Sequence, residues 1–309
     1  METPEFSIPK DGEMFIDLVL ERCRNLVDAG IWDGQFSHLR LDTWMGNFAT
    51  QAERYFGACV LDALIYRSDR QTVALMEQLF ERIIPDLIRR FPPAESNDRP
   101  WLEKLRGPLQ MPSPQGRVIP VLKLNDPPTK SGLLLARLYR RALGLNDAWM
   151  LWPWLIEHAK SVGIKQFLFV DDFLGTGEQF CEFVDQFSLV GRLDGCYAVY
   201  APLAAHVNGI AKVKERIPAL NIVAVEVIDQ RYSLFSEKSN WFNDQTNTPA
   251  SARAFYDQLV RRVQFPVKPE AIRGYGKLAL AYAFSHSTPD NCLPILWAAG
   301  MNWKPLLAR

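Results

Sequence analysis

The sequence predicts an α/β protein in which a parallel sheet follows a helical N-terminal region. Apolar residues recur at helical spacing over residues 15–88. A proline-rich stretch over 92–115 then interrupts the pattern. From 117 to 228, short apolar runs alternate with helical segments, as in parallel strands joined by helices. We therefore expect two regions, a helical region over 1–105 and an α/β domain over 106–309.

The N-terminal region is expected to hold three helices whose apolar faces form a core. The first carries its apolar face over 15–26 and stops at Gly30. The second spans 42–66. The third begins at a cap at Ser68 or Asp69 and ends at the proline pair that opens the linker.

The α/β domain is expected to alternate strands with helices. Its strands are predicted at 117–124, 165–170, 195–203 and 221–228. Its helices are predicted at 133–143, 147–162, 179–190 and 208–216. The run 165–170 is nearly continuously apolar, as expected of a strand buried on both faces. The last third is predicted to contain a loop over 230–251, a helix over 251–263 and a strand over 277–284.

The composition narrows the class of protein. The 309 residues include 35 basic and 35 acidic side chains, and 48% are hydrophobic, which is typical of a globular chain with a large core. Because the charges cancel, direct contact with nucleic acid is not evident. The five cysteines form no C-x-x-C pair, as expected of reduced thiols. With no signal peptide and no membrane-length apolar run, we expect a cytoplasmic protein without a membrane partner.

The stretch 167–180, FLFVDDFLGTGEQF, carries the clearest chemical signal. An apolar strand is predicted to end in Asp171 and Asp172, and a glycine-containing loop follows before a helix. Ligands of open α/β sheets bind at the carboxyl ends of strands, and the N–H groups of a helix N-terminus suit a phosphate. The candidate binding residues in this loop and helix start are Leu174, Gly175, Thr176, Gly177, Glu178 and Gln179.

The acidic pair suggests a sugar or a metal ion as ligand. The carboxylates of Asp171 and Asp172 can accept hydrogen bonds from sugar hydroxyls or hold Mg²⁺, so both are candidate catalytic and metal-binding residues. The alternative is a capped strand–helix turn with surface acids. A dinucleotide site is disfavoured because Phe180 stands where its motif needs a third glycine. A phosphotransfer aspartate site needs further acids and a lysine that the sequence does not place.

These residues resemble the motif of type I phosphoribosyltransferases that binds phosphoribosyl pyrophosphate (PRPP). In that family two acids after an apolar strand are followed by three loop residues, Thr-Gly and a helix. The matching residues here are Asp171, Asp172, Thr176 and Gly177. The family usually has hydroxyl residues where this chain has Gly175 and Gln179, so two donors are lost. The resemblance implies a parallel-sheet core like that of type I phosphoribosyltransferases.

The same resemblance implies a second loop that binds pyrophosphate at a helix start. The candidates are Lys130, Ser131 and Gly132, which follow the strand predicted at 117–124. Lysine supplies positive charge, and serine and glycine supply donors and a close approach of the backbone. The alternative is an ordinary proline-rich turn.

A third candidate group lies near the C-terminus. His286 follows the strand predicted at 277–284 and can act as an acid or base, or contact a leaving pyrophosphate. Asn291 can orient it. The alternative is a buried or capping histidine beside a turn.

Nearly the whole chain resembles the phosphoribosyltransferase-like proteins of bacterial conflict systems, called PRTase-CE. The resemblance lies in the helical N-terminal part, the acidic motif and an ending of the form H-x-x-P-x-N-x-L-P-x-x-W. The matching residues of this ending are His286, Pro289, Asn291, Leu293, Pro294 and Trp297. The resemblance implies a role in antiphage defence, with members in multi-gene loci such as those of retrons.

We therefore expect an enzyme of phosphoribosyltransferase type that binds PRPP or a related ribose phosphate and transfers or cleaves at the anomeric carbon. Mg²⁺ is the expected cofactor. The alternative is a non-catalytic module that senses a nucleotide or sugar phosphate and regulates a partner protein, and the two lost hydroxyl donors favour it. Other proteins of a defence complex are expected partners, because the helical region adds surface that catalysis does not need.

Overall fold

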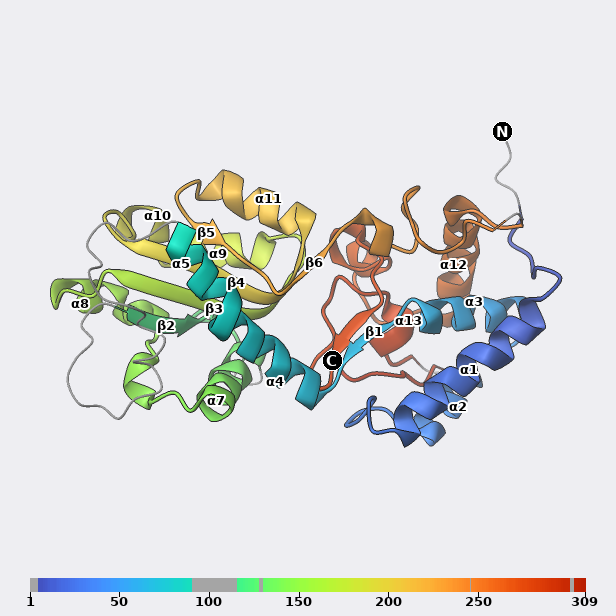
Figure 1. Ribbon diagram of the computed structural model, residues 1–309. Coiled ribbons are helices and arrows are strands. Elements are labelled where there is room, and N and C mark those ends of the chain that lie inside the picture. The colour runs from blue at the N-terminus through green and yellow to red at the C-terminus, as the bar shows by residue number, and fades with distance from the viewer. Residues whose placement is uncertain (1–4, 91–115, 128–129, 245, 301–302) are drawn as a thin grey trace. The chain divides into compact units, whose positions relative to one another are not determined.

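The computed structural model describes residues 5–90, 116–127, 130–244, 246–300 and 303–309. It divides into two compact units (Figure 1). The helical unit consists of Met1–Arg70 and Asp229–Arg309, and the sheet unit of Gln71–Ile228. This division differs from the expected boundary between residues 105 and 106, which itself lies, with the proline-rich linker, outside the described residues.

The sheet unit contains the parallel sheet that the sequence predicts. Strands β2 to β5 lie in that order, β6 also pairs with β4, and every pairing is parallel. The strands are β2 (Gly116–Pro120), β3 (Gln166–Leu174), β4 (Tyr197–His206), β5 (Asn221–Ile222) and β6 (Glu226–Ile228). The α/β class with a parallel core is thus confirmed.

Several elements differ from their predicted bounds. Strand β2 ends at Pro120 and not at residue 124, and the helix expected over 179–190 is divided into α9 (Glu178–Gln186) and α10 (Leu189–Arg192). The strand expected over 221–228 is divided into the short β5 and β6. Strand β3 continues to Leu174, so the acidic pair lies inside the strand and not after it. The continuation is possible because β4 runs alongside, with Phe173 paired to Ala204 and Leu174 to Ala205.

Helices cover both faces of this sheet. Figure 1 shows α9, α10 and α11 on one side and α7 on the other. The helices of the unit are most of α4 (Asp69–Gln78), α5 (Ile84–Arg90), α7 (Ser131–Leu143), α8 (Ile156–Ser161), α9 (Glu178–Gln186), α10 (Leu189–Arg192) and α11 (Val207–Arg216). A π-helical turn, Leu79–Ile83, joins α4 to α5. Alternating β3 side chains face opposite layers, and Phe169 packs against Phe180 and Phe183 of α9.

The prediction of one helix over 147–162 is wrong. Two 3-10 turns, Asp147–Trp149 and Pro153–Leu155, precede α8. Pro153 has no backbone N–H to donate to the preceding turn, so it begins a helical segment and cannot lie inside one.

The helical unit is built from the N-terminal and the C-terminal segments of the chain. It contains α1 (Gly12–Asp28), α2 (His38–Met45), α3 (Gln51–Asp62), α12 (Pro249–Val263), α13 (Pro294–Trp297) and a parallel pair of strands, β1 (Ile65–Arg67) and β7 (Tyr282–Phe284). The second helix expected, over 42–66, is therefore two helices and a strand. Thr50 separates the helices, because its hydroxyl accepts a hydrogen bond from the N–H of Glu53 at 3.2 Å and caps α3.

Apolar contacts between distant segments explain why the C-terminal residues belong to the helical unit. Phe56 of α3 stacks on Phe242, with ring centroids 5.5 Å apart. The indole N–H of Trp44 donates to the carbonyl oxygen of Ile295 at 2.8 Å. The N-terminal helices thus bury their apolar faces against residues 234–307 and form no separate core.

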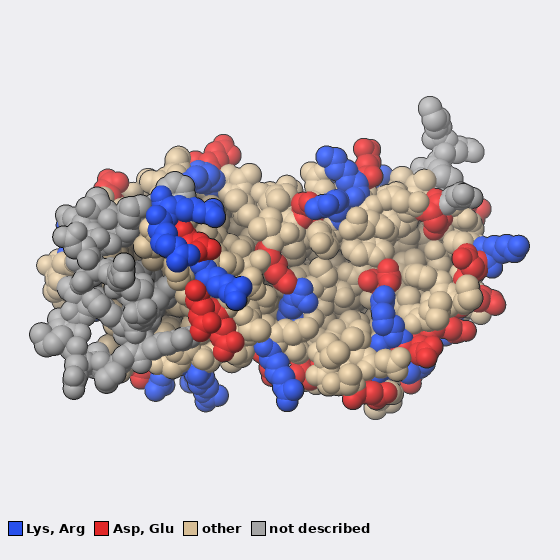
Figure 2. All heavy atoms as spheres, viewed as in Figure 1, with Lys and Arg blue, Asp and Glu red and all other residues tan. Residues whose placement is uncertain are grey.

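Charged side chains of both signs cover the surface. On the face drawn in Figure 2, lysines and arginines lie among aspartates and glutamates in each unit. Within the described ranges, no helix is both long enough and apolar enough to cross a membrane.

Candidate functional site

The acidic pair of β3 is buried and held by hydrogen bonds. Asp171 is 4% exposed and Asp172 is 8% exposed. Oδ1 of Asp171 accepts a hydrogen bond from the N–H of Asp172 at 3.0 Å, and its Oδ2 accepts one from the hydroxyl of Tyr200 at 3.0 Å. Oδ1 of Asp172 accepts one from the N–H of Phe173 at 2.9 Å. The two carboxyl groups are therefore oriented before any ligand binds.

The register of the sheet explains the contact between Asp171 and Tyr200. Tyr200 of β4 is paired with Phe169, and Phe169 and Asp171 lie two residues apart on the same face of β3. The Tyr200 ring stacks on Phe180 of α9, with centroids 3.7 Å apart and planes at 12°. This stack directs the tyrosine hydroxyl toward the carboxyl group.

Burial changes the protonation equilibrium at this site. Burial raises the pKa of Asp171 well above the usual carboxyl range, and the nearby charge of Asp172 raises that pKa further. The hydrogen bond from Tyr200 and the positive charge of Lys130 act in the opposite direction on the pKa of Asp171. A cation or a hydrogen-bond donor at the pair would thus stabilise its charged form.

Tyr139 of α7 adds a second buried hydroxyl near the pair. Burial raises the pKa of Tyr139, and the charges of Asp171 and Asp172 raise it further. Its hydroxyl is buried and has no hydrogen-bond partner among the residues that the structure describes. An unpartnered polar atom beside two buried carboxyl groups is consistent with a site that a polar ligand completes.

The stability of the sheet unit is expected to depend on the protonation of Asp171. Because its folded-state pKa lies above the unfolded value of about 3.9, the stability contributed by the protonated carboxyl is complete below about pH 4 and is lost as the pH rises toward the raised pKa. Asn in place of Asp171 does not titrate. The Asp171→Asn variant should therefore gain stability relative to the natural chain above pH 4, by up to about 1.4 kcal/mol per pH unit.

Urea unfolding of both proteins at several pH values measures this difference. Two stability curves that run parallel from pH 4 to pH 7 would contradict a raised pKa at Asp171.

The loop after β3 packs tightly against the start of α11. Gly177 caps α9 in the left-handed conformation, with φ of 85°. A Cβ at Gly177 would lie 3.0 Å from the carbonyl oxygen of Gly209, and one at Gly209 would overlap the carbonyl oxygen of Gly175. Glu178 forms an ion pair with Lys212 of α11. These contacts hold the loop, with its N–H groups at the start of α9, in one position.

The structure brings the two predicted loops together. Nζ of Lys130 donates a hydrogen bond to Oε1 of Gln179 at 3.1 Å. Ser131 and Gly132 begin α7, where a Cβ at Gly132 would lie 2.8 Å from the carbonyl oxygen of Val121. Thr176 is half-buried, and its hydroxyl oxygen accepts a hydrogen bond of 3.5 Å from the N–H of Glu178. The loops from β2 and β3 thus form one cluster at the carboxyl ends of adjacent strands.

The C-terminal candidates belong to the helical unit. The ring of His286 stacks on Phe284, with centroids 5.3 Å apart. Asn291 is buried, and its amide donates to the carbonyl oxygen of Tyr275 at 3.0 Å. This hydrogen bond ties Asn291 to the turn that begins at Gly274. A Cβ at Gly274 would overlap the carbonyl oxygen of Asn291, so the two backbones lie in close contact.

Sequence reasoning missed Tyr200, Tyr139 and Gly209. A signal for Tyr200 exists in the run YAVYAPLAA, because a tyrosine hydroxyl in a fully buried strand needs a hydrogen-bond partner. Nothing in the local sequence distinguishes Gly209 from any other helical glycine.

The acidic pair suits a metal ion that binds together with a phosphate-containing substrate. Among the described residues, no group of three or more His, Cys, Asp or Glu side chains could hold a metal. Mg²⁺ commonly binds through one or two carboxylates, with water and substrate phosphates as the other ligands. Asp171 and Asp172, whose charged forms a cation would stabilise, fit this type of site.

Comparison with known families identifies the chain. The family model PRTase-CE matches residues 41–309 of the 309 residues. The chain belongs to the PRTase-CE family. It is a phosphoribosyltransferase-like protein, and the PRTase-CE match includes both the acidic motif and the C-terminal segment of the helical unit. No curated protein sequence matches the chain.

Proposed function

We propose that this PRTase-CE protein is an effector of an antiphage defence system, of the kind encoded in retron loci, that acts on PRPP or a related ribose phosphate. The observation that carries the proposal is the cluster formed by two loops at the carboxyl ends of β2 and β3. Asp171, Asp172 and the loop before α9 lie at one strand end, and Lys130 bonds to Gln179 from the other. Ligands of parallel sheets bind at such strand ends.

Each part of the cluster is assigned one part of the ligand. Asp171 and Asp172 accept hydrogen bonds from the ribose hydroxyls. The backbone N–H groups of residues 174–179 hold the 5-phosphate at the start of α9. Lys130, Ser131 and Gly132 hold the pyrophosphate at the start of α7.

The proposed reaction breaks the bond between the anomeric carbon and the pyrophosphate oxygen. The electron pair leaves with pyrophosphate, and a nucleobase-type acceptor or water forms the new bond at the anomeric carbon and releases a proton. Lys130 stabilises the charge on the departing group. Bound Mg²⁺, held by the acidic pair, would supply further positive charge there. The assignment of His286 as an acid or base, with Asn291 as the residue that orients it, stays a prediction from the sequence, because both residues belong to the helical unit.

A second function is favoured by the same cluster. The hydroxyl residues of type I phosphoribosyltransferases are replaced by Gly175 and Gln179, and Gln179 bonds to Lys130. Two residues assigned to ligand binding thus bind each other. This feature supports a non-catalytic module that senses a nucleotide or sugar phosphate and regulates another protein of the defence complex.

Phosphorus NMR of the purified full chain with PRPP and Mg²⁺ tests these functions. An enzyme is expected to release pyrophosphate, with water or an added nucleobase as acceptor, over many turnovers. A sensing module is expected to shift the PRPP signals without releasing pyrophosphate. Signals that stay unchanged at millimolar PRPP would exclude PRPP as the ligand for either function.

A further inference from the structure

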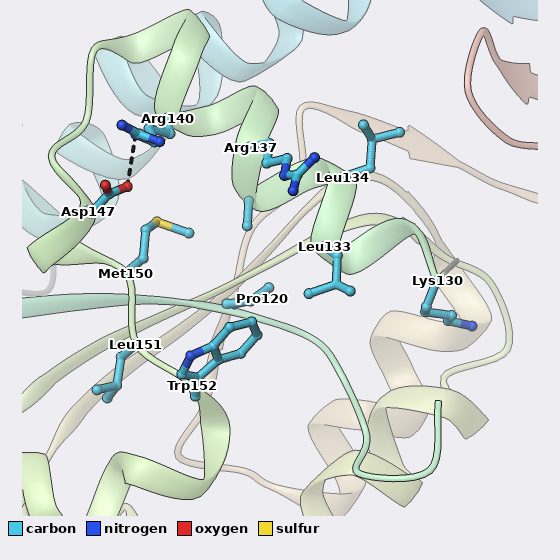
Figure 3. Close-up of a pocket in the computed structure, with 11 residues that line it drawn as sticks. Pro120, Lys130, Leu133, Leu134, Arg137, Arg140, Asp147, Met150, Leu151 and Trp152 are labelled. Atoms are coloured by element: carbon cyan, nitrogen blue, oxygen red, sulfur yellow. Dashed lines mark ion pairs between the residues drawn. The ribbon is translucent and has the colours of Figure 1, made fainter. Parts of the chain in front are cut away.

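A pocket lies beside α7, outside the acidic pair. It has a volume of about 590 Å³ and is formed by α7, the end of β2 and residues 147–152 (Figure 3). Neither Asp171 nor Asp172 lines it. The volume is within the range of about 300–1,000 Å³ that small-molecule pockets occupy. It is therefore large enough for a ligand of its own.

The α7 side of the pocket is positively charged. Lys130, Arg137 and Arg140 line it, and Asp147 is the one acidic residue among the described residues of its lining. Arg140 forms an ion pair with Asp147 at 2.8 Å, and Lys130 bonds to Gln179. Arg137 is exposed and has no ion pair or hydrogen bond among the described residues. Its planar guanidinium is left available for an anion, which it can bind through two parallel hydrogen bonds.

The opposite wall is apolar and aromatic. Figure 3 shows Trp152 close to Pro120, with Met150 nearby. Trp152 is 42% exposed, and its ring stacks on Trp154 with centroids 5.0 Å apart and planes at 6°. This stack limits the orientations of the Trp152 ring. A preoriented, half-exposed indole is a favourable surface for a flat ring.

The sheet holds this wall in place. The N–H of Leu151 donates a hydrogen bond to the carbonyl oxygen of Val118 at 2.9 Å. Met150 forms an isolated parallel β-bridge with Val118 of β2. The aromatic wall is therefore attached to β2, and the charged wall belongs to α7, which contacts β2 and β3. Both walls rest on regular secondary structure, as a preformed ligand pocket requires.

We propose that the α7 pocket binds a small anion with a flat aromatic ring, of the class of nucleoside monophosphates. The ring packs on Trp152 and Met150, and the phosphate pairs with Arg137. The pocket shares Lys130 with the sugar-phosphate site proposed above, but Arg137 and Trp152, which are proposed to contact the nucleotide, have no part in that site.

Calorimetry of the full chain with adenosine monophosphate, without PRPP, tests this proposal. Arg137→Gln is expected to weaken binding at least tenfold, and Trp152→Ala to reduce the preference for adenosine monophosphate over inorganic phosphate. Arg141→Gln is the matched control, because Arg141 is exposed on the same helix and does not line the pocket. Its affinity should equal that of the natural chain. Circular dichroism of each variant shows whether it is folded.

A variant of the acidic pair distinguishes binding at the α7 pocket from binding at the proposed sugar-phosphate site. Binding of adenosine monophosphate that persists in the Asp171→Asn/Asp172→Asn variant supports the α7 pocket. Binding that is lost in that variant but kept in Arg137→Gln would assign the nucleotide to the acidic pair and overturn the proposal. The proposal is also overturned if the natural chain does not bind adenosine monophosphate at millimolar concentration.

Discussion

The Asp171→Asn/Asp172→Asn variant is expected to lose binding of PRPP with Mg²⁺ and to keep its fold. Asparagine has nearly the shape of aspartate, and its carbonyl oxygen can still accept the hydrogen bond from the N–H of Asp172 or from Tyr200. The variant removes two charges that would bind sugar hydroxyls or a cation. Hydrogen bonds to charged groups contribute about 1.5–3 kcal/mol each, so affinity should fall on the order of 100-fold or more.

The fold of this variant should be preserved because the substitution removes an unfavourable buried charge. The raised pKa of Asp171 shows that burial disfavours its ionised form. Thermal unfolding of the variant is therefore expected at or above the temperature of the natural chain.

Calorimetric titration with PRPP and Mg²⁺ measures the loss of affinity. Asp194→Asn is the matched control, because Asp194 is an exposed acid of the same unit, outside the candidate site. The control should bind as the natural chain does. Unchanged affinity in the double variant would refute the assignment of the acidic pair to the ligand.

Gly209→Ala is expected to displace the loop before α9, although Gly209 itself lies outside the candidate site. The added Cβ would overlap the carbonyl oxygen of Gly175 and lie 2.9 Å from Cγ of Leu174, so the loop must move. Overpacking of this kind costs about 1–3 kcal/mol. That cost exceeds the gain of about 1 kcal/mol that alanine brings to a helix over glycine.

The functional effect of Gly209→Ala should be larger than its effect on stability. A loop that binds phosphate through backbone N–H groups must be placed within about 0.5 Å. Displacement of the Gly175 carbonyl changes the adjacent N–H groups at the start of α9, and PRPP affinity should fall at least about tenfold.

The helical Gly191→Ala variant is the matched control for this prediction. A Cβ at Gly191 meets no atom within 4 Å, so this alanine should be neutral or stabilising. Calorimetry and urea unfolding of both variants separate the two effects. Equal behaviour of Gly209→Ala and Gly191→Ala would contradict the close packing of the loop on α11.

Local patterns predicted the sheet unit well. The alternation of strands and helices from β2 to α11 is visible because each element carries its own periodicity. The start of α9 is visible because Gly177 needs a left-handed conformation that glycine adopts readily. The end of β3 was placed too early, because two aspartates normally end an apolar run, and here Tyr200 and backbone N–H groups compensate their burial.

The helical unit was harder to predict because its core joins distant segments. The helices α1 to α3 show clear apolar faces. Helix α1 packs against α3, but other partners lie more than 170 residues later in the chain, as in the contact between Phe56 and Phe242. Periodicity shows that a face is buried and does not show what covers it. The expected boundary near residue 105 followed from a composition change, whereas the units follow from contacts.

The sequence alone determined the α/β class, the parallel strands and the position of the acidic motif, because these depend on residues that are neighbours in the chain. Only the tertiary structure decided that Tyr200 and Tyr139 accompany the acidic pair, that Lys130 meets Gln179 and that Gly209 supports the loop. The physical reason is that these contacts arise from strand register and helix packing. Register and packing are set by the burial of the whole unit, which no single segment encodes.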